Sequence, residues 1–265
     1  MSAEVFQKIN ELLSKGEKFA VATIVNVEGS SPRGAGAKMI IRENGDTFGS
    51  IGGDCAERAV VDEALNSIMN EESKTLNISL EEEEEGGIGM KCGGEIEVSI
   101  EIVEPTPNII IIGGGGIASK VAELGDKTGF SVKVIDPFAE KTDFPNETQV
   151  IDKSVEEGLS KISINQNSYV VIITRHKYDI PALKGVLGKD AKYIGLMGSQ
   201  DRVKSQFKEL QEDGFSREEL SRVHAPVGLE IGAETPEEIA VSIIAEIIKV
   251  RRISNDSGEN LKISF

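Results

Sequence analysis

The sequence predicts an α/β protein with an N-terminal α/β domain followed by a domain built on a doubly wound parallel sheet. Two patterns carry this prediction. In the second half, short runs of β-branched and aliphatic residues alternate with segments of helical periodicity, the order that a parallel sheet with crossover helices produces. In the first half, strand-like segments are interspersed with two helical ones. We expect domains at residues 1–104 and 108–253, and a mobile tail at 254–265.

The first half begins with a helix over residues 4–15, whose apolar residues share one face. Segments with strand-like composition or alternation follow at 19–29, 38–44, 46–51, 74–80 and 95–103. Asn44-Gly45 is a favoured two-residue turn, so the second and third of these segments are expected to form a hairpin. A glycine loop enters the helix of residues 52–72, and the two prolines of residues 104–108 bound the domain.

The second half starts with a continuous apolar run at residues 108–112, as expected of a buried parallel strand. A glycine turn then enters a helix within residues 113–129. Further strands are expected at 130–136, 148–152, 168–174 and 191–198, and helices near 155–160, 180–188 and 199–213. The last helix has Thr235 as N-cap, Pro236 at its first position and Glu238 to complete a capping box.

Composition narrows the range of partners. The formal net charge is −16, whereas nucleic-acid binding needs basic patches, so we expect no nucleic-acid partner. No charge-free apolar stretch approaches 18 residues and the amphipathic start does not resemble a signal peptide, so we expect no membrane association. With only two cysteines, Cys55 and Cys92, the chain is predicted to be cytoplasmic with reduced thiols.

The glycine turn of the second half is the first candidate site. Gly113, Gly115 and Ala118 form a GxGxxA pattern between a predicted strand and helix, and Asp136 ends the next strand. Such a Rossmann-type turn holds a pyrophosphate at the helix N-terminus, while the acid accepts hydrogen bonds from a ribose. A Rossmann fold that has lost its nucleotide is the alternative. His176, after a later strand, lines the same crevice as an acid, base or donor, or is structural.

The two cysteines form the second candidate, because each lies in a glycine-rich loop. The flanking glycines are Gly52 and Gly53 before Cys55, and Gly93 and Gly94 after Cys92. Glycines leave space beside a sulfur atom, and the helix N-terminus predicted near Cys55 lowers a thiol pKa. Small buried side chains are the alternative. Two cysteines and two histidines show no zinc-ligand spacing, so a zinc site is not expected.

The loop of residues 29–38 is the third candidate. It is net positive in an acidic chain, and its serines, backbone N–H groups, Arg33 and Lys38 suit an anion. An ordinary loop with two solvated charges is the alternative. His224, in a segment expected to fold over the sheet, is interpreted as structural, with a place in the site as the alternative.

The chain resembles the XdhC/CoxI family in seven segments, in order from about residue 19 to 252. They are GSSPRGAGAKMII, GSIGGDCAE, MKCGGEIEVSIE, IIGGGGIA, VIDP, YIGLMGS and APVGLEIGAETPEEIAVSIIAEI. The resemblance implies an accessory factor that binds the molybdenum cofactor (molybdopterin, possibly as a dinucleotide), supports its sulfuration and delivers it to a xanthine dehydrogenase-type hydroxylase. It implies a chaperone rather than a turnover enzyme, with the apo-hydroxylase and a cysteine desulfurase as partners, and a homodimer.

The same resemblance implies that Cys55 and Cys92 contact the metal or its sulfur, since they match the two cysteines of the family. Two positions depart from the family pattern. Asp54 replaces a glycine before Cys55 and should oppose thiolate formation, and Gly116 replaces a histidine of the glycine turn, a role that His176 could take over. We expect both thiols to meet at the mouth of the Rossmann crevice, with the ligand in the cleft between the domains.

Two other functions remain open at this level. The glycine turn with Asp136 is also typical of an NAD(P)-dependent oxidoreductase, although no committed acid or base for hydride transfer stands out. The two thiols could instead form a reversible disulfide in a redox-sensing nucleotide-binding module.

Overall fold

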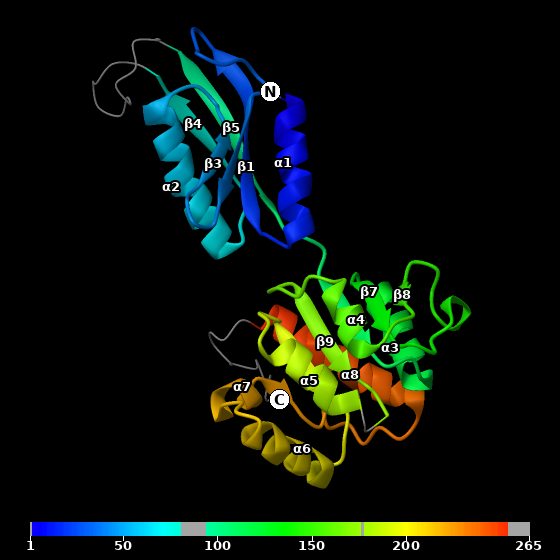
Figure 1. Cartoon of the computed structure of the whole chain (residues 1–265). Coiled ribbons are helices and arrows are strands. Elements are labelled where there is room, and N and C mark those ends of the chain that lie inside the picture. Colours follow the sequence, from blue (N-terminus) through cyan, green and yellow to red (C-terminus); the bar gives the residue numbers. More distant parts are fainter. Residues whose placement is uncertain (1, 81–93, 176–177, 254–265) are drawn as a thin grey trace, which may run out of the picture. The chain divides into compact units, whose positions relative to one another are not determined.

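The computed structural model describes residues 2–80, 94–175 and 178–253, with only the backbone described at Ser2, Asp54 and Cys55. The chain divides into two compact units, Met1–Pro105 and Thr106–Phe265 (Figure 1). Among the helices that the structure describes, none combines the length and the apolar character needed to traverse a bilayer.

The first unit is built on a five-stranded antiparallel sheet with the order β3-β2-β1-β5-β4. Its strands are β1 (Phe19–Glu28), β2 (Lys38–Arg42), β3 (Thr47–Gly49), β4 (Lys74–Ser79) and β5 (Glu95–Val103). Each face of this sheet is covered by one helix, α1 (Ser2–Lys15) or α2 (Asp54–Asn70). Alternation along β1 explains this, because Ala20 and Ala22 pack in the cluster of α2 while Phe19 and Val21 pack with α1.

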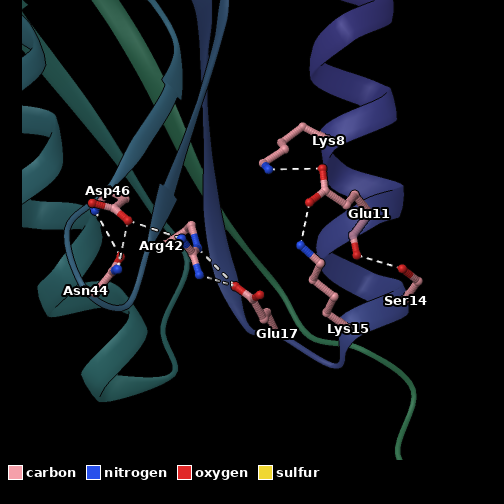
Figure 2. Close-up of polar contacts among 8 residues, drawn as sticks. All are labelled: Lys8, Glu11, Ser14, Lys15, Glu17, Arg42, Asn44 and Asp46. Carbon is pink, nitrogen blue, oxygen red and sulfur yellow. Dashed lines mark hydrogen bonds and ion pairs between the residues drawn. The ribbon is translucent and has the colours of Figure 1, made fainter. Parts of the chain in front are cut away.

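The β2–β3 hairpin is confirmed, but its predicted two-residue turn is wrong. The Arg42 N–H donates to the Asp46 carbonyl (2.9 Å) and the Gly45 N–H to the Arg42 carbonyl (2.9 Å), which leaves a three-residue loop. Gly45 has a φ of +84°, the left-handed conformation that this loop type places at its last residue. The Arg42 guanidinium also bonds Glu17 and Asp46, and so ties the hairpin to the segment after α1 (Figure 2).

The second unit is a six-stranded parallel sheet with the order β11-β10-β9-β6-β7-β8. Its strands are β6 (Asn108–Ile112), β7 (Ser131–Ile135), β8 (Gln149–Ile151), β9 (Ser168–Ile172), β10 (Tyr193–Leu196) and β11 (Val223–His224). This is the Rossmann order, in which the chain reverses its direction of winding between β6 and β9. The predicted α/β class with a doubly wound parallel sheet is confirmed, and ligand crevices in such sheets open at the carboxyl ends of the strands flanking the switch.

Helices cover both faces of this sheet. They are α3 (Gly116–Lys127), α4 (Val155–Ser160), α5 (Asp179–Leu187), α6 (Gln200–Glu212), α7 (Arg217–Ser221) and α8 (Pro236–Arg252), with a 3₁₀ turn η1 (Lys141–Asp143). Along β6, Ile109 and Ile111 pack in the cluster of α3 and α8, whereas Ile110 and Ile112 pack in the cluster of α4, α5 and α6. Burial on both faces is why this strand is apolar at four consecutive positions.

The predicted start of α8 is confirmed. The Thr235 hydroxyl accepts from the Glu238 N–H (3.3 Å), and the Glu238 carboxylate accepts from the Thr235 N–H (3.0 Å). The 3₁₀ turn, α7 and β11 have no counterpart in the sequence prediction. They are too short to show a periodicity of their own.

Candidate functional site

Glycine-rich segments that are distant in the sequence meet at one end of the first unit. Strands β1 and β5 pair down to Glu28 and Glu95, so the loop that leaves β1 starts beside the residue that enters β5. That residue, Gly94, packs directly on the loop. A Cβ atom there would lie 2.4 Å from the Ser30 carbonyl oxygen and 2.7 Å from the Glu28 carbonyl oxygen. Only glycine allows this approach.

The loop before α2 reaches the same region. A Cβ atom on Gly52 would lie 3.7 Å from the ring of Pro32, in ordinary van der Waals contact. The loop of residues 29–38 therefore lies against both the segment that leads to Cys55 and Gly94, the first described residue after Cys92. The sequence identified these three segments separately, and the fold brings together those parts of them that the structure describes.

Glu57 fastens the loop that precedes Cys55. It lies in the first turns of α2, and its Oε1 atom accepts hydrogen bonds from the Ser50 hydroxyl (2.6 Å) and from the N–H groups of Ile51 (3.2 Å) and Gly52 (3.3 Å). One carboxylate oxygen thus folds this loop back onto the helix. Sequence reasoning missed Glu57, although a glutamate in the first turns of a helix, reaching back to preceding N–H groups, is a familiar start signal.

The described residues test the cysteine predictions only in part. Cys55 is the second residue of α2, so its backbone lies at a helix N-terminus as predicted. Cys92, Gly93 and His176 lie outside the described residues, and the meeting of the two thiols therefore stays a prediction. Among the residues that the structure describes, no group of three or more histidine, cysteine or acidic side chains is arranged to hold a metal ion.

The two cations of the predicted anion cradle lie in different surroundings. The Lys38 ammonium donates to the Thr23 hydroxyl (2.8 Å) and lines a cavity of about 290 Å³ with Gly36 and Gly49. Arg33 is not among the residues lining that cavity, and its carbonyl accepts a hydrogen bond from the Ser31 hydroxyl (2.9 Å). A shared role of Arg33 and Lys38 stays a prediction.

A second, larger cavity of about 700 Å³ opens in the Rossmann unit, at the carboxyl ends of β6, β7 and β9. Five segments line it: Gly113–Gly115, Ile135–Phe138, Ser154–Glu156, Ile173–Arg175, and the start of α5 with Pro181 and its N-cap residue Tyr178. This is the crevice that a doubly wound sheet forms at its switch point, and its volume falls in the range of small-molecule sites.

The glycines of the turn have distinct roles. A Cβ atom on Gly113, whose φ is +118°, would lie 2.1 Å from the Ile173 carbonyl oxygen, and one on Gly114 would lie 2.9 Å from the Ala139 side chain. Close packing therefore explains these two. At Gly115 a Cβ atom would meet nothing within 4 Å, so this glycine faces open space. Ala118 is fully buried in the core beneath α3, where it serves helix packing.

Asp136 follows β7 and holds two sides of the cavity together. One carboxylate oxygen accepts from the Gly114 N–H (2.8 Å) and the other from the Phe138 N–H (2.7 Å). The predicted acid is thus at the predicted place, locked between the glycine turn and the loop after β7. A carboxylate has about four acceptor positions, so two remain for other donors.

A buried polar cluster supports the β9 side of the cavity. The Asp179 carboxylate, fully buried, accepts from the Thr174 hydroxyl (2.5 Å) and the Gln206 amide (2.7 Å), and its oxygen lies 3.3 Å from an Arg202 guanidinium nitrogen. These bonds orient Thr174, which lines the cavity. The cluster joins α5 and α6 to the end of β9, and such distant pairing leaves no periodic signal in the sequence.

Glu246 organises a second polar cluster, where α8 crosses β10 and β11. Its carboxylate accepts from the Tyr193 hydroxyl (2.5 Å) and the Gly228 N–H (2.8 Å), and lies 3.3 Å from Nδ1 of His224. Burial opposes its ionisation, but hydrogen bonds from His224, Tyr193 and Gly228 lower the Glu246 pKa to about 2. Burial, together with Glu246, raises the pKa of Tyr193. These contacts place His224 in the cluster with Tyr193 and Glu246, and its structural role stays the interpretation made from the sequence.

The fold and the site define a class: an α/β protein with a Rossmann unit and, in its other unit, glycine-rich segments that pack on the loop after β1, one of them leading into a helix that begins beside a cysteine. Comparison with protein families supports this class. Residues 109–247 match the XdhC Rossmann domain, and residues 12–79 match the XdhC and CoxI family. The chain belongs to the XdhC and CoxI family, which confirms the predicted resemblance.

Three relatives cover more than nine-tenths of the chain. It is 32% identical to the uncharacterized protein YqeB of Escherichia coli over 93% of its own length, but spans about half (46%) of that protein. It is 27% identical to a probable subunit of xanthine dehydrogenase from Bacillus subtilis, covering 92% of the chain and 96% of the relative. It is 22% identical to the molybdenum cofactor insertion chaperone PaoD of Escherichia coli, covering 91% and 86% respectively.

Among solved structures, the crystal structure of a xanthine dehydrogenase from Bacillus halodurans is similar over 95% of this chain and 97% of that one. Its sequence identity is 24% and its TM-score 0.52, so the similarity concerns the fold.

Proposed function

We propose that this chain is an accessory factor that binds the molybdenum cofactor and transfers it to a molybdenum hydroxylase of the xanthine dehydrogenase type. The observation that carries the proposal is the convergence of the glycine-rich loops at Gly94, Ser30 and Gly52, in a chain that belongs to the XdhC and CoxI family. The names of the Bacillus subtilis relative and of PaoD, a cofactor insertion chaperone, support it.

The thiols of Cys55 and Cys92 are the proposed contacts to the cargo. Molybdenum with its sulfur ligands is a soft centre that suits thiolates. A helix N-terminus favours the thiolate form, and Cys55 occupies that position in α2. Support of sulfuration follows from the same chemistry, with a cysteine desulfurase as the proposed sulfur source.

Cofactor loading tests the proposal directly. The full chain is expressed together with the cofactor biosynthesis genes, purified, and assayed for molybdenum by mass spectrometry and for oxidised pterin by fluorescence. Cys55→Ala and Cys92→Ala should each lose most of both signals. Gly188→Ala, in the other unit, is the control, because a Cβ atom there meets nothing within 4 Å and its φ of −80° suits alanine. Full loading of both cysteine variants would contradict the role of the thiols.

Partner binding tests the transfer step separately. Tagged protein should recover an apo-hydroxylase and a cysteine desulfurase from cells that produce both, and loaded protein should restore activity to purified apo-hydroxylase. Recovery of neither partner, together with no restored activity, would count against an accessory role even if the cofactor binds.

A further inference from the structure

We infer that the 700 Å³ cavity of the Rossmann unit binds a nucleotide whose ribose keeps both free hydroxyls and whose base stacks on Phe138. This inference goes beyond the proposed cofactor role, because it rests on the second unit alone and on none of the cysteine loops.

Phe138 is the first observation. Its side chain is 80% exposed, yet it lines the cavity beside Pro137. The loop that carries it is held at its base, since the Phe138 N–H donates to the Asp136 carboxylate and the Ala139 N–H to the Asp136 carbonyl (3.3 Å). An aromatic ring presented on a fixed loop at a cavity is a stacking surface for a planar base.

The phosphate position follows from the glycine turn. Gly115 faces open space at the cavity, whereas Gly113 and Gly114 are packed against the protein. A phosphate can therefore approach the backbone closely at Gly115. Arg175 lines the cavity from the end of β9, and its guanidinium is suited to phosphate oxygens.

The preference for a ribose with both hydroxyls free follows from two carboxylates, those of Asp136 and Glu156. Asp136 is locked by two N–H donors and keeps free acceptor positions, so it can accept from ribose hydroxyls. Glu156 adds a second carboxylate to the lining. A phosphate on the 2′-oxygen would face this negative charge and would be repelled.

Nucleotides of two sources share this chemistry: a free adenine dinucleotide, or the nucleotide part of a molybdenum cofactor in its dinucleotide form. Isothermal titration of the full chain with NAD, NADP, AMP and CMP separates them. Binding of AMP and NAD without CMP indicates the free adenine nucleotide, whereas binding of CMP indicates the cofactor's nucleotide part. In both cases Phe138→Ala should weaken binding about tenfold, the equivalent of one lost stacking contact.

Phe48→Ala is the matched control, because Phe48 is an exposed aromatic (40%) on β3 in the other unit. It should leave binding unchanged, and NADP should bind at least tenfold more weakly than NAD. The inference is overturned if none of the four compounds binds at millimolar concentration, or if Phe138→Ala binds as tightly as the native chain. Equal affinity for NAD and NADP would overturn the ribose assignment. Molybdenum loading of the Cys55→Ala and Cys92→Ala variants is measured separately from these titrations, so a failure of nucleotide binding and a failure of the proposed thiol role are distinguishable.

Discussion

Glu246→Gln should destabilise the Rossmann unit in a pH-dependent way. The Glu246 side chain is only 14% exposed, and it receives hydrogen bonds from Tyr193 and Gly228 and lies against His224. Burial acts against its charge, but these partners outweigh burial and lower its pKa from 4.5 to about 2. The charged carboxylate is therefore preferred in the folded state over the unfolded one.

The size of the effect follows from that difference. At about 1.4 kcal/mol per pH unit, lowering the pKa from 4.5 to about 2 contributes about 3 kcal/mol at neutral pH, which partial solvent screening reduces to about 2 kcal/mol. Because the folded pKa is the lower one, the contribution is complete above pH 4.5 and is lost as the pH falls toward 2. Less than half should remain at pH 3.

Urea unfolding followed by tyrosine fluorescence measures the free energy of unfolding of the second unit within the intact chain. The protein has no tryptophan, and its three tyrosines, Tyr169, Tyr178 and Tyr193, all belong to the second unit. Glu237→Gln on the same helix is the control, since that side chain is 62% exposed and should matter by less than about 0.5 kcal/mol. The reasoning is refuted if Glu246→Gln costs no more than the control at pH 7, or costs the same at pH 3 as at pH 7.

Three further predictions concern the two sites. Gly94→Ala forces a Cβ atom to 2.4 Å from a carbonyl oxygen, so it should destabilise the first unit by about 1–3 kcal/mol in thermal unfolding and should reduce cofactor loading. Gly188→Ala should change neither, because a Cβ atom there meets nothing within 4 Å. Glu57→Ala should lower the stability of the first unit by about 2 kcal/mol and alter the alkylation rate of Cys55, measured by mass spectrometry. Glu57→Gln keeps an acceptor oxygen and should recover most of the stability and most of the native rate. An unchanged alkylation rate in Glu57→Ala would contradict the positioning role. Gly113→Ala should prevent native folding of the second unit, measured by circular dichroism, because its Cβ atom would collide with the backbone. Gly115→Ala should fold normally but weaken nucleotide binding. Normal folding of both variants would refute the packing argument.

Several parts of the fold were predictable because their signals are local. The four-residue apolar run of β6, the capping box of Thr235 and Glu238 and the glycine turn before α3 each follow from backbone or burial demands within a few neighbouring residues. The hairpin loop shows the limit of such reasoning. Asn44-Gly45 indicates a turn, but the register of β2 and β3 sets the loop length, and register depends on packing across the whole sheet.

The candidate sites also contain residues that the sequence identifies and residues that only the structure identifies. Their glycines and Asp136 stand out in the sequence, because glycine marks close approach and an acid after the second strand marks a Rossmann turn. Which glycine faces open space could not be read locally. Gly113 is crowded by Ile173, which follows β9, and Gly114 by the loop after β7, whereas Gly115 is not crowded. The roles of Glu57, Asp179 and Glu246 were missed, because each depends on partners brought in from other elements.

By itself, the sequence determined the α/β class, the doubly wound parallel sheet of the second half and the membership of the XdhC and CoxI family, because periodicity and ordered motifs are carried along the chain. Tertiary structure alone decided that Gly94, Ser30 and Gly52 gather at one end of the first sheet, and that Phe138 lines a cavity with Gly115. The physical reason is that these contacts join residues far apart in the chain, and only strand pairing and close packing bring such residues to within a few ångströms of one another.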